Sequence, residues 1–453
     1  MEGRAKITRR ITRAFLPPPE LLKTFPSDEA MRSEYRTWRW RQLATTFIGY
    51  AVFYFVRKNF SMAMPLMERE GYTKQTLGIF ITLHDVVYGF SKFVNGMLAD
   101  RANPRWFMAT GLLASAAVNL VFGFQSAVIV MGVLLILNGW FQGMGFPPVA
   151  RVLSHWFSPR ERGTMWGLWN TSHQVGAAGI FVLAGYLATW YGWRAVFIGP
   201  ALIAIVVSLF IAARLRDTPG SVGLPPVEVL HGHEPVRHRA SPPPSEAFHK
   251  VLWARVFSNP YIWLICIANF FIYVIRYVFM NWAPTYLQQV KGVQLDSAGW
   301  TLAFFEVAGL VGSLLAGWIT DRFFGSRRAP VCVAFMIATG AAVYGLLLLP
   351  SGASNLTVSA VICAVGFFDY GPQFLVGVMM ADIASKEAAA SAIGLSGFFG
   401  YLSGIVSGWG MGYILTHQGW EGGFRLLVGC AVLGAVLFGL CWNVSARPPH
   451  HDD

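Results

Sequence analysis

Two arginines lie inside long apolar segments, where a charge needs a reason. Arg57 and Arg276 are 219 positions apart, and no carboxylate occupies the positions i±3 or i±4 of either one. Charged side chains at bilayer depth are costly, and they usually mark a binding or transport pathway. Because a guanidinium matches phosphate oxygens bidentately, two arginines at equivalent depths predict a site for a phosphate dianion.

Four more side chains suit such a site. Lys92 adds a point charge, and Tyr50 and Tyr54 precede Arg57 by seven and three positions, on the same helical face. Their hydroxyls can donate to phosphate, and the alternative for both tyrosines is packing. His173 lies in the middle of an apolar segment, where an imidazolium would supply a third positive charge and a neutral ring would only pack.

Further ionisable groups in apolar segments are Lys58, Asp85, Glu306 and Asp369. For Lys58 and Glu306 we expect a salt bridge, because paired charges neutralise each other in a low dielectric. An acid near a bound phosphate repels it unless the acid is offset. Asp85 and Asp369 are therefore expected either to pair with a lysine or to contact the organic part of a substrate.

The composition indicates what must position these residues. Of 453 residues, 55% are hydrophobic and 13% are charged, against about 25% charged in soluble domains. This excludes disordered, nucleic-acid-binding and disulfide-scaffold proteins. Segments longer than about 18 apolar residues are typical of membrane helices, and the sequence predicts twelve, near 42–66, 76–99, 106–124, 127–149, 163–189, 194–214, 258–289, 296–321, 329–349, 354–381, 388–413 and 421–443.

These segments predict an all-α polytopic membrane protein with two six-helix bundles. The predicted parts are a tail (1–41), a bundle (42–214), a Pro-rich linker (215–257), a second bundle (258–443) and a second tail (444–453). Lys and Arg number 26 in the tails and the even-numbered connections with their flanks, but 5 in the odd-numbered connections with theirs. By the positive-inside rule, both termini are cytoplasmic.

An internal repeat supports two related halves. The pattern Gly-x-x-x-Asp-Arg occurs at 96–101 and again at 317–322, each time at the end of an apolar segment. Parallel six-helix repeats of this kind are related by an axis along the membrane normal. The chain has no P-loop, dinucleotide fingerprint or catalytic triad pattern, so we expect no enzyme activity and no cofactor or metal. A gradient or an exchange must then drive any transport.

Several segments together resemble the organophosphate:phosphate antiporter family of the major facilitator superfamily, namely 53–60, 88–93, 139–145, 169–173, 273–277 and 282–286. The resemblance implies the major facilitator fold, with two pseudo-symmetric bundles, and rocker-switch exchange of inorganic phosphate for a phosphate ester. It also implies that Arg57 and Arg276 hold the phosphoryl group, that Lys92 and His173 assist, and that Lys58 and Glu306 form an interdomain bridge. Members for glycerol-3-phosphate look closest, with hexose-6-phosphate transporters and a sugar-phosphate sensor nearby.

The resemblance leaves alternatives open. Asp85 and Asp369 stand where the family usually has neutral residues, so proton-coupled symport through one of them is an alternative. A membrane sensor that signals to a kinase is another. We expect the partners to be a phosphorylated small molecule, inorganic phosphate and membrane lipid, with no nucleic acid. We also expect a monomer in a bacterial-type inner membrane.

Overall fold

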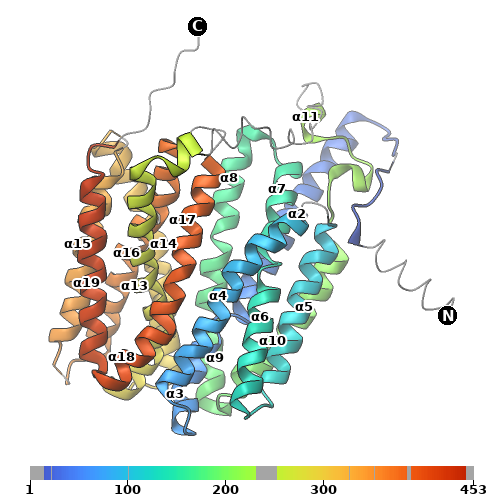
Figure 1. Cartoon of the computed structure of the whole chain (residues 1–453). Helices are drawn as coiled ribbons and strands as arrows, with labels where there is room; N and C mark the ends of the chain where they lie inside the picture. Colours follow the sequence, from blue (N-terminus) through green and yellow to red (C-terminus); the bar gives the residue numbers. More distant parts are fainter. Residues whose placement is uncertain are drawn as a thin grey trace. The chain divides into compact units, whose positions relative to one another are not determined.

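The computed structural model describes residues 15–21, 23–99, 102–230, 253–325, 327–350, 352–384 and 389–444 (Figure 1). Within these ranges the secondary structure is helical, without strands. Asp100 and Arg101 of the first repeated element lie outside the described residues, as do most of the predicted linker and nearly all of the carboxy-terminal tail.

The helices of the first part of the chain are α2 (Asp28–Phe55), α3 (Phe60–Arg69), α4 (Lys74–Ala99), α5 (Pro104–Phe122), α6 (Val128–Gln142), α7 (Phe146–Trp156), α8 (Pro159–Asn170), α9 (Ser172–Tyr191), α10 (Ala195–Arg214), η1 (Pro219–Val222) and α11 (Val227–Leu230). Those of the second part are η2 (Trp253–Phe257), α13 (Pro260–Lys291), α14 (Leu295–Phe323), α15 (Ala329–Leu348), α16 (Asn355–Ile383), α17 (Ala389–Ile405), η3 (Val406–Gly410), α18 (Met411–His417) and α19 (Gly419–Leu440).

Eleven segments of the described chain are long and apolar enough to cross a membrane. The predicted first span, 42–66, is not one of them, and it is divided between two helices by a break at residues 56–59. α2 before the interruption begins with the charged residues Asp28 and Glu29, and α3 after it has only 10 residues. The expectation of one continuous first helix was therefore wrong.

The described helices pack into two compact units. Unit 1 holds the described residues of the ranges 1–59, 87–180 and 194–240, and unit 2 holds those of 60–86, 181–193 and 241–453. In unit 1, α10 packs against α2 and α5, and in unit 2, α14 packs along α16 and α13 along α17. The division of the chain into bundles 42–214 and 258–443 stays a prediction.

Two further predicted spans, 127–149 and 163–189, contain helix interruptions, and both interruptions lie in unit 1. α6 ends at Gln142 and α7 begins at Phe146, while α8 ends at Asn170 and α9 begins at Ser172. Gly143, in the first interruption, lies against α4, where a Cβ would come within 2.8 Å of the backbone nitrogen of Lys92. The helix therefore breaks at a glycine that lets the backbone of α4 approach closely.

Long helices run past each other in unit 2. A Cβ on Gly312 of α14 would lie 1.8 Å from the carbonyl oxygen of Phe367 in α16, and one on Gly366 of α16 would lie 2.6 Å from that of Phe305 in α14. Only glycine allows backbones to approach this closely. This contact fixes the register in which α14 and α16 present their polar residues.

Candidate anion-binding site

The interruption after α2 places Arg57 in irregular backbone. Val56 ends the helix, and its freed carbonyl accepts hydrogen bonds from the buried amides of Asn119 (3.0 Å) and Asn138 (2.8 Å). Asn59 donates to the Asn119 side chain at 3.0 Å. Non-helical backbone at membrane depth is tolerated only where its polar groups are satisfied. These three asparagines meet that condition and so hold the break in place.

Arg57 is surrounded by aromatic faces. Its guanidinium carbon lies 3.8 Å from the centre of the Tyr54 ring and 4.8 Å from that of Tyr88, which is buried. Cation–π contacts of this kind contribute about 0.5–2 kcal/mol. Stacking on ring faces fixes the plane of the guanidinium but does not use the N–H groups at its edge. This arrangement therefore suits an arginine that binds an anion.

The aromatic cluster continues from Tyr54 towards α8 and α9. The ring of Tyr50 lies 5.8 Å from that of Tyr54 and 4.9 Å from that of Trp169. The ring of His173 lies 5.9 Å from that of Tyr54. Nδ1 of His173 contacts the carbonyl oxygen of Asn170, which only accepts, so Nδ1 carries a hydrogen and Nε2 is the titrating nitrogen.

Lys92 belongs to the same unit. Its Nζ lies 4.6 Å from the centre of the Phe146 ring, which also lies 6.2 Å from the ring of Tyr50. Unit 1 thus holds five of the predicted site residues, namely Tyr50, Tyr54, Arg57, Lys92 and His173. Lys58, also in unit 1, is buried and donates its backbone N–H to the carbonyl oxygen of Tyr54 at 2.9 Å.

Arg276 in unit 2 has a different environment. It is buried in the middle of α13, and its Nη2 lies 3.9 Å from Oε2 of Glu306 in α14. Its guanidinium carbon lies 4.2 Å from the centre of the Tyr370 ring in α16. The helix of Arg276 carries no acid at neighbouring positions, yet the fold supplies one from α14. The separation exceeds hydrogen-bond length, so the pair is electrostatic.

Asp369 lies next to Tyr370 in α16 and is fully buried. Arg276 is close enough to interact with it electrostatically. Neither carboxyl oxygen of Asp369 has a hydrogen-bond partner among the described residues. Unit 2 therefore places one guanidinium near two carboxyl groups, and one of these groups has hydrogen-bonding capacity to spare.

Asp85 lies in a separate part of unit 2. Its Oδ1 is 2.9 Å from Nδ1 of His84, and both residues are buried. A Cβ on Gly404 of α17 would approach the Cβ of Asp85 to 2.8 Å. Thr82, one turn earlier, donates to the carbonyl oxygen of Gly404 at 3.1 Å and accepts from the N–H of Trp409 at 2.8 Å. Asp85 thus sits at a tight contact between α4 and the α17–η3 segment.

The chain matches the model of the Major Facilitator Superfamily over residues 46–408, with a second match over 295–453. It is 40% identical to the glycerol-3-phosphate transporter of Bacillus subtilis, covering 96% of this chain and 99% of the relative. It is 35% identical to a probable hexose phosphate transport protein of Chlamydia pneumoniae, covering 96% and 97%. It is 37% identical to the membrane sensor protein UhpC of Salmonella typhimurium, covering 97% and 99%.

The chain belongs to the organophosphate:phosphate antiporter family of the Major Facilitator Superfamily. Among solved structures, a bacterial homologue of the human lysosomal transporter Spinster matches with a TM-score of 0.70 at 15% identity, covering 90% of this chain and 96% of that one. This likeness shows the fold alone. The antiporter-family chain is thus a multi-pass membrane protein with the major facilitator fold, as its sequence predicted.

Some residues of this site were not predicted from the sequence. Tyr88, over Arg57, lies one turn before Lys92 on the same face, so helical periodicity could have found it. Tyr370, over Arg276, adjoins Asp369 in the sequence but gave no signal of its own. Asn119 and Asn138 were not predicted, because the local sequence does not indicate which distant carbonyl a side-chain amide will bind.

Proposed function

We propose that this protein is a secondary transporter that exchanges a phosphorylated small organic solute for inorganic phosphate by rocker-switch alternating access. The solute is of the glycerol-3-phosphate or sugar-phosphate class. The observation that carries the proposal is Arg57, held at a helix interruption by buried amides and covered by the rings of Tyr54 and Tyr88. An arginine held at bilayer depth in this way is better suited to binding phosphate than to a purely structural packing role.

In the proposed mechanism Arg57 and Arg276 each bind phosphoryl oxygens, and Lys92 and His173 add positive charge. Tyr50 and Tyr54 donate their hydroxyls, and Lys58 and Glu306 form a bridge that helps to set the state of the transporter. Asp85 or Asp369 contacts the organic part of the solute. The names of the relatives, which include transporters for glycerol-3-phosphate and hexose phosphate, support the substrate class. We place the protein in a bacterial inner membrane, as a monomer with both termini in the cytoplasm.

The test is exchange in proteoliposomes loaded with phosphate. We expect uptake of labelled phosphate, glycerol-3-phosphate or a hexose phosphate to require phosphate inside. Arg57→Lys should lower this uptake about a hundredfold. Arg425→Lys is the matched control, because Arg425 is a mostly exposed surface residue paired with Glu421. Uptake into phosphate-free vesicles that a protonophore abolishes would favour symport instead.

A sensor is the second candidate, because the chain is 37% identical to a membrane sensor protein over nearly its whole length. A sensor binds the phosphate ester with little flux and needs a partner kinase. Substrate binding at normal affinity by a purified protein that does not exchange phosphate in proteoliposomes would favour the sensor.

A further inference from the structure

Three arginines gather at the end of α10 in unit 1, away from the site described above. Arg41 of α2, Arg105 of α5 and Arg216, two residues beyond α10, are half-buried. The guanidinium carbons of Arg41 and Arg216 lie 4.7 and 5.7 Å from the centre of one ring, that of Trp38. Arg105 lies 4.7 Å from the ring of Trp106. These three arginines are called the arginine cluster below.

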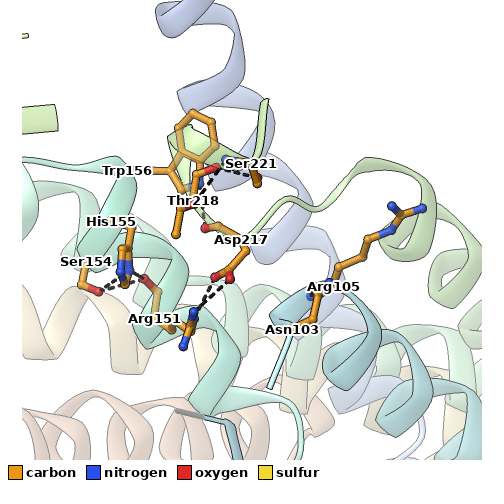
Figure 2. Close-up of polar contacts among 9 residues, drawn as sticks. All are labelled: Asn103, Arg105, Arg151, Ser154, His155, Trp156, Asp217, Thr218 and Ser221. Carbon is orange, nitrogen blue, oxygen red and sulfur yellow. Dashed lines mark hydrogen bonds and ion pairs between the residues drawn. The ribbon is translucent and has the colours of Figure 1, made fainter. Parts of the chain in front are cut away.

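Among the described residues, the acidic side chains of Glu161 and Asp217 are paired with other arginines. Arg39 pairs with Glu161, and Arg151 binds Asp217 through Nε at 2.7 Å and Nη2 at 2.9 Å. Figure 2 shows the Asp217 carboxylate turned to Arg151, whereas the guanidinium of Arg105 extends away from it. Across the described ranges, no ion pair includes a member of the arginine cluster.

Capping of α10 accounts for part of the arginine cluster. Nε of Arg105 donates to the carbonyl oxygen of Ala212, and Nη1 of Arg216 donates to those of Ala213 (3.1 Å) and Leu215 (2.8 Å). A helix carboxyl end carries about half a negative charge. Arg105 and Arg216 face this end and Arg41 lies near them, so the helix charge offsets only a fraction of the three positive charges.

The residual charge works against the folded state. Burial lowers the pKa of Arg216, and the positive charges of Arg105 and Arg41 lower it further. Like charges gathered at one place in a folded chain are destabilising unless a counter-charge binds there. An anion that contacts all three guanidiniums would relieve the repulsion.

The position of the arginine cluster along the helices indicates the source of the anion. Leu202, Val206 and Leu209 follow each other along one face of α10, and all three are exposed. In a multi-pass membrane protein such a face contacts acyl chains. The arginine cluster lies past the end of this face, at the level where tryptophan rings and lipid headgroups meet.

We propose that the arginine cluster binds the phosphate group of an anionic membrane lipid, such as phosphatidylglycerol. Basic pockets between membrane helices at the cytoplasmic side suit such headgroups. The guanidiniums could bind the phosphate of a lipid headgroup or free inorganic phosphate in the same way. Only a lipid also places acyl chains on the exposed apolar face of α10.

The experiment uses the full chain in neutral detergent and follows the ligand-induced rise in unfolding temperature, which reports binding to the folded state. The probes are short-chain phosphatidylglycerol, phosphatidylcholine of equal chain length and inorganic phosphate. We expect phosphatidylglycerol alone to act through the arginine cluster. Arg41→Gln, Arg105→Gln and Arg216→Gln should each lower the affinity for phosphatidylglycerol about fivefold. This is the contribution of one basic residue near an anionic membrane surface.

Arg36→Gln is the matched control, because Arg36 is an exposed residue of α2 outside the arginine cluster. Arg41→Gln keeps the test meaningful if the other variants unfold, since Arg41 caps no carbonyl within the part of the chain that the structure describes. A loss in Arg36→Gln as large as in Arg41→Gln would reduce the effect to general surface attraction and overturn the proposal. An equal rise in unfolding temperature with phosphatidylcholine would also overturn it. A rise with inorganic phosphate that depends on the same arginines would assign the site to the free ion instead of a lipid.

Discussion

The two arginines predicted to share one task have different surroundings. Arg57 lies in irregular backbone, among aromatic rings, at one of three helix interruptions in unit 1. Arg276 lies inside a continuous helix of 32 residues, between a tyrosine ring and two buried acids. If both bind phosphate, the anion at Arg276 must compete with Glu306. The pair is therefore symmetric in sequence and asymmetric in electrostatics.

The largest effect is expected from removing the guanidinium fork on either side. Arg57→Lys and Arg276→Lys keep the charge but lose bidentate binding. Each should lower the rate of phosphate exchange about a hundredfold, the loss of one or two charge-assisted hydrogen bonds. Exchange is measured in proteoliposomes at matched protein content, with Arg425→Lys as control. Near-normal exchange by either site variant would break the shared-phosphate mechanism.

Glu306→Gln tests the asymmetry directly. Removing the negative charge 3.9 Å from Arg276 should raise the affinity for inorganic phosphate about tenfold, because the anion no longer competes with a carboxylate. Binding is measured on the purified protein by calorimetry. The surface pair supplies the control, Glu421→Gln, which should change nothing. Unchanged or weaker phosphate binding by Glu306→Gln would show that Glu306 does not oppose the anion.

The amide supports of the interruption in unit 1 give the next effect. Asn119→Ala removes one of the two donors to the Val56 carbonyl and should lower stability by about 0.5–1.5 kcal/mol, the net contribution of one buried hydrogen bond. It should also weaken phosphate binding, because the break positions Arg57. Asn269→Ala in unit 2, which removes a 2.8 Å hydrogen bond to the Ser396 carbonyl, should lower stability only. Thermal unfolding and phosphate binding are compared in both. Equal losses of phosphate affinity in the two variants would show that the helix break does not position the anion site.

Asp369→Asn and Asp85→Asn separate recognition of the solute from bracing. Asp369 is buried near Arg276 with hydrogen-bonding capacity to spare, whereas Asp85 packs against α17 beside His84. We expect Asp369→Asn to lower exchange of phosphate esters several-fold and leave phosphate self-exchange nearly unchanged. Asp85→Asn should affect both alike, as bracing requires. Similar factors for phosphate and all esters in both variants would end the specificity hypothesis.

The smallest effect concerns His173. With Nδ1 bound to the Asn170 carbonyl, Nε2 gains its proton only below the imidazole pKa, ordinarily near 6.5. In the proposed mechanism the positive charge of His173, and its share of the affinity for the anion, is present at low pH and lost as pH rises. We expect a two- to threefold fall in affinity between pH 5.5 and 7.5 that His173→Gln removes. Because phosphate itself titrates in this range, the ratio of the two proteins is the quantity to compare.

Much of this was predictable from one sequence. Apolar segments of about 20 residues determine the membrane class, because a bilayer leaves a helix few alternatives. The placement of Arg57 and Arg276 in two such segments pointed to an anion, since an intramembrane charge is too costly to be accidental. The family followed from ordered local motifs, which are a property of the chain alone.

The tertiary structure decided which groups surround each charge. Helical periodicity relates a residue to its own helix only, so nothing near Arg276 in the sequence foretold that α14 and α16 bring Glu306 and Asp369 to it. The break at Arg57 was equally hidden, because the residues before it form a good apolar helix. It persists because amides from α5 and α6, sixty and more residues away, satisfy the exposed carbonyl of Val56.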